Sequence, residues 1–496
     1  MLHGLWRSTC LACHFSMDAK PAMIGASGVN SADMRPSAFF LCVFLFCVSL
    51  LILGYSVIFN PLDHDEYEHL YSAYLMLQGQ VPYRDFFQHH HFLYWIFLAP
   101  FVKSFPDTYY LLYIGRSLSL CALLITAFYT YKISVLKGGD RKSVFLFVTV
   151  LLSIDMVVHS SLLVRPDIFM VGAFFSGLYY YIIYLKNKNL LCLVLSFLLF
   201  FASFLFLQKA VFLLFGFCLC AIYQLYKKEL YLRDFLIALV LPLLALGYLL
   251  YFMSKEHVLV DYFELNWLFN FKISMVYGWV RLKHPLFFCS ISLIIAEIRI
   301  IKRAPFQFTS IIFLGFCVFF ALLPTPYEQY YIPLFPFIVI TLSSSFSILQ
   351  DRKIKNAIVA LLLLLVFYNA VQSISSFVMD GIDKCVKRQY DIVLRVTSED
   401  EEILGSHEVC PVRRDVQGYY WHNLELSQLD TEHFSRGKEL YDIPELIMTK
   451  SPKVLWVDFV DDYFNDSRFK DFIEQNYTRV CNIYVAKSIP PEVYQD

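Results

Sequence analysis

Long apolar runs recur along most of this chain, and each is close to the ~20 residues that a helix needs to cross the hydrocarbon core of a membrane. Hydrophobic residues make up 58% of the 496 positions and charged residues 17%, whereas soluble domains carry roughly 25% charged residues. The pattern predicts an all-α polytopic membrane bundle of about eleven transmembrane helices. We expect the spans at 38–59, 109–131, 143–158, 168–185, 190–206, 210–226, 235–253, 286–301, 306–323, 330–349 and 357–372.

Lysine and arginine predict the orientation of this bundle. They are frequent in one set of short loops and sparse in the opposite set, and cytoplasmic loops carry the excess. We therefore expect a multi-pass protein of the inner (plasma) membrane, with a cytoplasmic N-terminus and an extracytoplasmic C-terminus. The net charge of −1 predicts no nucleic-acid partner. The cation-rich loops are 132–142, 186–189, 227–234, 302–305 and 350–356.

Composition divides the chain into three parts. Residues 1–37 form a cytoplasmic N-terminal segment, in which Met34 is an alternative start because it directly precedes the first span. Residues 38–372 form the transmembrane domain, with long outer loops at 60–108 and 254–285. Residues 373–496 are more charged and predict a small extracytoplasmic α/β domain.

The C-terminal part has its own periodicities. Alternating apolar residues predict strands at 454–457 and 480–485, and polar, helix-like patterns predict helices at 436–449 and 466–476. Three cysteines lie here, Cys385, Cys410 and Cys481, which allows one disulfide and leaves one thiol over.

The first outer loop predicts two helices that lie along the membrane surface. Residues 65–79 place aromatic and aliphatic side chains on one helical face, and Gly79 can end that helix. Residues 92–101 are apolar but too short to span, and Tyr94 and Trp95 suit an interfacial aromatic belt.

An acidic segment, from Asp63 to His69, follows the first span. A carboxylate at a membrane surface can take a proton from an acceptor hydroxyl and make it nucleophilic toward a sugar carbon. Asp65 is the candidate base, with Glu66 beside it. The structural alternative is a capping box, in which Asp63 and Glu66 close the N-terminus of the helix.

Further charged groups lie on the same outer side. Arg165 and Asp167 flank Pro166 between two spans, where ionisable groups are costly unless functional or paired with each other. Lys209 lies at an outer turn between apolar flanks and could hold a lipid phosphate; snorkelling at a helix end is the alternative. Tyr331 lies in a tyrosine-rich outer segment that could contact phosphate or simply form an aromatic belt.

Three consecutive histidines, His89 to His91, precede the apolar segment at 92–101. Histidine and carboxylate side chains bind divalent cations, so a divalent cation is possible, although three consecutive histidines cannot all point at one ion. Phosphate contact or packing is the alternative, and we assign no cofactor and no metal ligand from the sequence.

The first outer loop resembles that of the GT-C glycosyltransferases, in particular family 39 and its bacterial relatives, which include protein O-mannosyltransferases and lipid A aminoarabinose transferase. The similarity covers about residues 38–350. It differs at 88–91, where lipid A-type members have Glu-Lys-Pro-Pro. The similar segments are Asp65–His69, Gly79–His90, Leu93–Trp95, Arg165–Asp167, Gln208–Lys209 and Tyr330–Pro336.

The resemblance implies an inverting transfer of a monosaccharide from a polyprenyl-phosphate donor to an acceptor hydroxyl on a protein, lipid or glycan. Asp65 would be the general base, with Glu66 and Asp167 as supporting acids. The alternatives are a transporter or flippase of lipid-linked sugars, and a polymerase or ligase of surface polysaccharide. The residues implied to contact the donor phosphate are Lys209, His89, Arg165 and Tyr331.

Overall fold

A computed structural model describes most of the chain from Met34 onward. The expected span at 286–301 and most of that at 306–323 lie outside the described residues, as does the segment before Met34. The described ranges are 34–106, 109–272, 309, 312–313, 315–316, 328–349, 351–380, 384–420 and 442–494.

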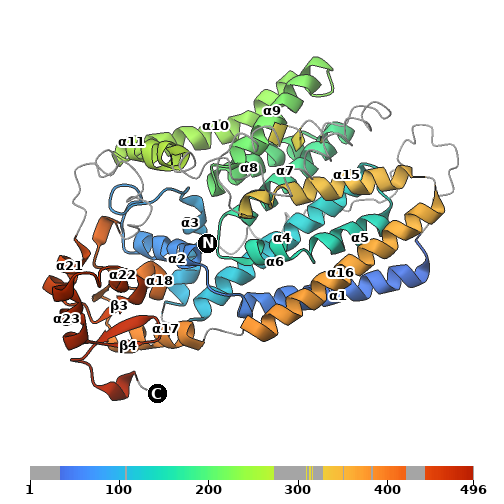
Figure 1. Ribbon diagram of the computed structural model, residues 1–496. Coiled ribbons are helices and arrows are strands. Elements are labelled where there is room, and N and C mark those ends of the chain that lie inside the picture. Colours follow the sequence, from blue (N-terminus) through green and yellow to red (C-terminus); the bar gives the residue numbers. More distant parts are fainter. Residues whose placement is uncertain are drawn as a thin grey trace, which may run out of the picture. The chain divides into compact units, whose positions relative to one another are not determined.

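Six helices among the described residues are long and apolar enough to cross a membrane (Figure 1). They coincide with expected spans, because each apolar run is bounded by the charged or polar residues that begin or end it. They are α1 (Pro36–Phe59), α4 (Tyr110–Leu136), α7 (Asp167–Asn187), α10 (Leu232–Lys255), α15 (Leu334–Ile348) and α16 (Arg352–Asp380).

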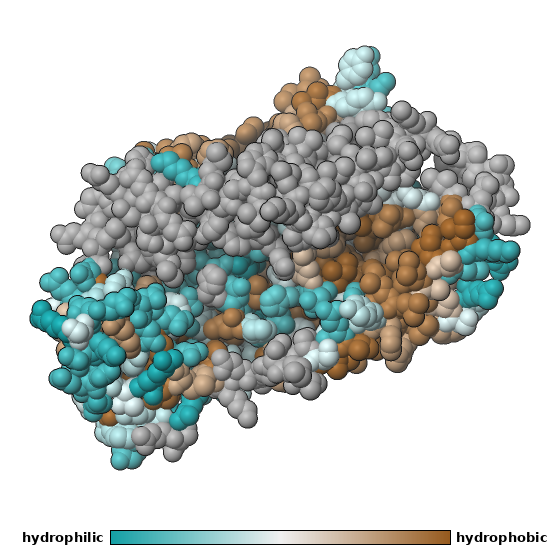
Figure 2. All heavy atoms as spheres, in the orientation of Figure 1, coloured by the Kyte–Doolittle hydropathy of each residue, from teal (hydrophilic) through white to brown (hydrophobic). Residues whose placement is uncertain are grey.

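The remaining apolar helices are shorter. The span expected at 143–158 is a pair of helices, α5 (Arg141–Leu151) and α6 (Asp155–Leu162), bent by 66° at the break between them. The spans expected at 190–206 and 210–226 coincide with α8 (Leu190–Phe206) and α9 (Ala210–Tyr226). The chain is therefore a helical, multi-pass membrane protein. Figure 2 shows apolar side chains over the helices and hydrophilic ones over the C-terminal part.

The two helices of the first outer loop lie where the sequence predicts them. Asp63 and Glu66 form the predicted capping box at the start of α2 (His64–Leu77), and Gly79 follows the helix with a positive φ of 82°. In α3 (Leu93–Ser104), however, Tyr94 and Trp95 are completely buried, so they are core residues and not an interfacial belt. The apolar face of α2 is likewise buried in protein, including Tyr67 and Tyr71.

The C-terminal part contains short helices and strands. A three-stranded antiparallel sheet has the order β3 (Val454–Trp456), β5 (Ile483–Ala486), β4 (Tyr477–Val480). The strand expected at 480–485 is interrupted at 481–482 by the turn between β4 and β5, where Cys481 adopts a positive φ of 55°, and 483–485 lie in β5. Two short strands, β1 (Glu402–Ile403) and β2 (Arg414–Asp415), pair in parallel.

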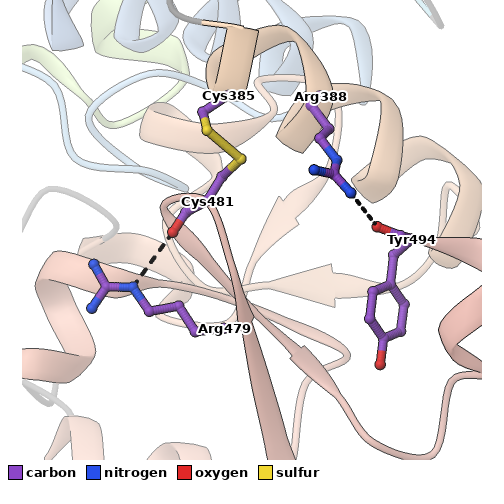
Figure 3. Close-up of a disulfide and its surroundings, with 5 residues drawn as sticks. All are labelled: Cys385, Arg388, Arg479, Cys481 and Tyr494. Atoms are coloured by element: carbon purple, nitrogen blue, oxygen red, sulfur yellow. Dashed lines mark hydrogen bonds between the residues drawn. A yellow bond between two sulfur atoms is a disulfide. The ribbon is translucent and has the colours of Figure 1, made fainter. Parts of the chain in front are cut away.

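Helices complete the C-terminal part. The helix predicted at 466–476 is confirmed as α23 (Ser467–Asn476), and that at 436–449 overlaps α21 (Ile443–Lys450). A disulfide joins Cys385 of α17 (Lys384–Val396) to Cys481 (Figure 3). Cys410 is completely buried. Shorter elements are α18 (Ser406–Val409), η4 (Gly418–Tyr420), α22 (Val457–Asp461) and η5 (Pro491–Val493).

The C-terminal part contacts the first outer loop directly. The backbone N–H of Asp415 donates to the hydroxyl oxygen of Tyr71 on α2 at 3.0 Å. The Tyr419 hydroxyl donates to the carbonyl of Tyr83 at 2.8 Å, and the N–H of Phe87 donates to the carbonyl of Tyr419 at 2.9 Å. The first of these bonds attaches the C-terminal part to the buried face of α2, and the other two attach it to the segment that follows α2.

Candidate functional site

The acidic groups predicted from two separate outer loops meet in space. Arg165, in the turn before α7, forms a close ion pair with Asp65 of α2. The guanidinium of Arg165 also lies 3.7 Å from Asp63 and 3.6 Å from Asp167, the first residue of α7. Asp65, Asp167 and Arg165 therefore converge on one site, and the Asp65 side chain keeps 18% of its surface exposed.

Glu66 forms a separate, buried ion pair with Arg116 of α4. Arg116 Nε and Nη2 donate to the two carboxylate oxygens of Glu66 at 2.8 and 2.5 Å, and both side chains are at most 1% exposed. The N–H of Val164 donates to Glu66 Oε1 at 3.0 Å. Glu66 thus ties α2, α4 and the Arg165 turn together.

His69 lies one helical turn after Asp65, so both residues occupy the same face of α2. Trp95 Nε1 donates to His69 Nδ1 at 3.1 Å. Burial, with the charges of His89 and Lys209, lowers the pKa of His69 to about 3. The ring is therefore neutral at physiological pH, and because Nδ1 accepts a hydrogen bond its proton is on Nε2.

Gln88 fixes the histidine segment. Its side-chain amide donates to Glu68 at 2.8 Å and to Ser72 at 2.9 Å. Its carbonyl oxygen accepts from the backbone N–H groups of His89 at 2.9 Å and His90 at 3.3 Å. Gln88 therefore holds the buried carboxylate of Glu68 and the two histidines in one arrangement.

Lys209 joins this region from the turn between α8 and α9. Its ammonium lies 3.6 Å from the ring centre of Tyr330 in the 3-10 helix η3 (Glu328–Tyr331). Tyr330 precedes Tyr331, the candidate phosphate contact. Gln208 donates to the backbone carbonyl of His89 at 3.2 Å. Lys209, His89 and the Tyr330–Tyr331 pair thus come from three distant segments to one place.

The second outer loop also reaches the histidines. It contains α11 (Leu259–Phe263) and the π-helix η1 (Glu264–Phe269). Asn270 donates to the carbonyl of His89 at 2.7 Å, and the Tyr262 hydroxyl lies 2.9 Å from His91 Nε2. His91 therefore faces Tyr262, while His89 and His90 lie together near Glu68.

An apolar groove of about 680 Å³ lies between α4, α7 and α8. Its walls include several small residues, which leave the space open, and Phe169 and Phe206 lie at the end nearest the acidic groups. The small residues are Ala122, Gly172, Ala173, Ser176 and Ala202.

Sequence reasoning missed several residues that build this site. Arg116 is the partner of Glu66, fifty positions earlier in the chain. The first outer loop has more acidic residues than a helix cap needs, and this was the sequence feature that could have indicated a buried ion pair. His69, Gln88 and Tyr330 lie in segments that resemble the family's, but the sequence assigns them no role, because their roles depend on neighbours from other segments.

The fold has known counterparts, although the sequence matches no family profile and no curated protein. The crystal structure of ArnT from Cupriavidus metallidurans in the apo state superposes with a TM-score of 0.59 at 13% identity, over 91% of this chain and 98% of that one. This chain has the ArnT fold. The same protein bound to undecaprenyl phosphate gives a TM-score of 0.57 at 10% identity, over 90% of this chain and 97% of that one.

ArnT is a lipid A aminoarabinose transferase of the GT-C superfamily. The expected fold class, a GT-C-like helical membrane bundle with strands in the C-terminal part, is therefore confirmed. The ArnT fold also covers the C-terminal part, since nearly the whole chain superposes. The roles of individual residues stay predictions.

Proposed function

We propose that the protein is a membrane glycosyltransferase that moves a monosaccharide from a polyprenyl-phosphate donor to an acceptor hydroxyl. The convergence of Asp65, Asp167 and Arg165 at one site carries this proposal. The ArnT fold supports it, because an ArnT structure binds undecaprenyl phosphate.

Asp65 is the general base in this proposal. Its carboxylate takes the acceptor proton as the hydroxyl attacks the anomeric carbon, and the phosphate leaves from the opposite face, which inverts the centre. Arg165 orients Asp65 and Asp167 from the side. Glu66 acts as a positioning residue, since its oxygens are bound by Arg116 and Val164.

Two regions of the protein bind the two parts of the donor, its lipid tail and its phosphate. The polyprenyl tail occupies the apolar groove between α4, α7 and α8, where burial of hydrocarbon is favourable. The phosphate meets Lys209, His89 and Tyr331, and the Nε2–H of His69 adds a neutral donor. Such donors stabilise the negative charge that develops on a departing phosphate.

The site faces the extracytoplasmic side in this proposal. The lysine- and arginine-rich loops lie at the other ends of the helices, as the positive-inside rule requires for cytoplasmic loops. The Cys385–Cys481 disulfide agrees with this orientation, because disulfides persist in oxidising compartments.

Cysteine labelling tests this orientation. In a variant that lacks accessible native cysteines, Gln78→Cys, exposed after α2, is expected to react in intact cells with a maleimide that cannot cross the membrane. Arg141→Cys, exposed at the start of α5, is expected to react only after permeabilisation. The reverse pattern would place the acidic site in the cytoplasm and refute the proposed direction of transfer.

The activity itself is tested with purified protein and labelled polyprenyl-phosphate sugars. We expect release of free polyprenyl phosphate that depends on added membrane acceptors. A transporter or flippase would instead move the intact lipid-linked sugar across reconstituted vesicles without releasing the phosphate. A polymerase or ligase would consume lipid-linked oligosaccharides and leave single-sugar donors intact.

A further inference from the structure

A small pocket lies where the C-terminal part meets the ends of α2 and α3. Its volume is about 260 Å³, and the buried side chains of Val102 and Val412 form part of its wall. Tyr74 lies nine positions after Asp65 on α2, an axial rise of about 13.5 Å, so the pocket is separate from the acidic site. The polar residues that line it are Tyr74, Gln78, Lys103, Glu399 and Arg413.

Two opposite charges line this pocket without neutralising each other. Lys103 and Glu399 are both exposed, and neither forms an ion pair with any residue that the structure describes. A ligand that carries a negative and a positive group would satisfy both side chains at once. We propose that the pocket binds the headgroup of a membrane phospholipid with a phosphodiester and a primary ammonium, as in phosphatidylethanolamine.

The cations of the pocket suit the phosphodiester. Arg413 is buried, and its guanidinium donates to the hydroxyl and the carbonyl of Thr397 at 3.0 and 3.2 Å. It also donates to the carbonyl of Val412 at 2.9 Å. These bonds fix the guanidinium in place, and their acceptors are uncharged. Lys103 supplies a second positive charge, and arginine and lysine are the side chains that proteins use to bind phosphate groups.

Tyr74 and Glu399 suit the remaining groups of the headgroup. Burial raises the pKa of Tyr74, so its hydroxyl stays protonated and can donate to a phosphate oxygen. The carboxylate of Glu399 can accept from a primary ammonium, which has three N–H donors. A choline headgroup has no N–H donor, and a glycerol headgroup has no positive charge. The pocket is therefore expected to prefer ethanolamine over both.

The position of the pocket fits a lipid headgroup. Lys103 lies in the last turn of α3, and Phe105 follows with 43% of its surface exposed. Tyr110, the first residue of α4, is 61% exposed, and α4 is long and apolar enough to cross a membrane. Exposed aromatic side chains at the end of a span lie at the membrane surface, where basic side chains meet lipid phosphates. The pocket is thus at headgroup level, beside this end of α4.

Lipid binding tests the proposal directly. Full-length protein in detergent is mixed with phosphatidylethanolamine, phosphatidylglycerol and phosphatidylcholine of identical acyl chains, and bound lipids are counted by native mass spectrometry. We expect one phosphatidylethanolamine per chain, bound about 10-fold more tightly than the other two, the contribution of one charge-assisted hydrogen bond. Lys103→Gln is expected to weaken all three lipids about 10-fold. Glu399→Gln is expected to remove only the preference for phosphatidylethanolamine.

Two matched controls remove the same charges outside the pocket. Lys255→Gln lies at the end of α10, and Asp400→Asn lies next to Glu399; both native residues are exposed and neither lines the pocket. We expect both variants to bind lipid as the wild type does. The ligand variants should fold, because Lys103 and Glu399 form no ion pair with a described residue. Their melting temperatures without added lipid check this, and phosphatidylethanolamine should raise the melting temperature of the wild type alone.

Wild-type protein that does not prefer phosphatidylethanolamine would overturn the proposal. So would equal lipid binding by Lys103→Gln and Lys255→Gln. Displacement of the bound lipid by inorganic phosphate alone would assign the pocket to a free anion and would also overturn it. The proposal does not rest on the transfer activity, since the release of polyprenyl phosphate is measured separately and its absence would leave the lipid site as described.

Discussion

Asp65→Asn is expected to lower the rate of sugar transfer by about 10²- to 10⁴-fold, the usual contribution of a general base. Asparagine preserves the shape of the side chain and can still accept a hydrogen bond from Arg165, but it cannot take the acceptor proton. The measurement is the rate of polyprenyl-phosphate release by purified protein at saturating donor.

Asp63→Asn is the matched control for Asp65. Asp63 also lies near Arg165, at 3.7 Å, and the substitution removes the same charge. Asparagine caps a helix as well as aspartate does, so α2 should keep its N-terminus. We expect Asp63→Asn to retain most activity. Equal losses in both variants would mean that charge around Arg165 matters and that Asp65 is not the base.

Arg116→Met is expected to destabilise the protein by about 3–5 kcal/mol, the usual cost of removing one partner from a buried ion pair. The substitution leaves the Glu66 carboxylate buried without its main partner. It also frees the backbone carbonyls of Asn60 and Pro61, which accept from Arg116 at 2.9 Å each. The expected readout is a marked fall in the melting temperature of detergent-solubilised protein.

Arg84→Met provides the comparison. Arg84 also pairs with acids, Asp85 and Glu256, at 2.9 Å, but its side chain is 42% exposed. Exposed ion pairs contribute at most about 1 kcal/mol, so this variant should melt close to the wild type. A double variant, Glu66→Leu with Arg116→Met, should recover part of the lost stability. An unchanged melting temperature in Arg116→Met would refute the structural role of the pair.

The elements defined by local signals were predictable from the sequence. The Asp63–Glu66 capping box and Gly79 set the ends of α2 within a residue or two. Apolar runs predicted α1, α7 and α16, because a membrane span needs a minimum length of apolar side chains. The loop charges also predict that Asp65 and Asp167 lie on the same outer side of the membrane.

Features that depend on distant segments were not predictable. Tyr94 and Trp95 have the composition of an interfacial belt, and only the packing of α2 and α3 shows them to be core residues. The partner of Arg116 lies fifty positions away. The turn at Cys481 interrupts an otherwise continuous apolar alternation, because a positive φ leaves no trace in hydrophobic periodicity.

One helix links the two halves of the proposed donor site. Asp167 is the first residue of α7, and Gly172 and Ser176 of the same helix line the apolar groove. The axial rise from Asp167 to Gly172 is about 7.5 Å. An α-helix hardly changes length, so the depth at which a lipid tail is seated would fix how far its headgroup stands from the carboxylate, whichever sugar that headgroup carries.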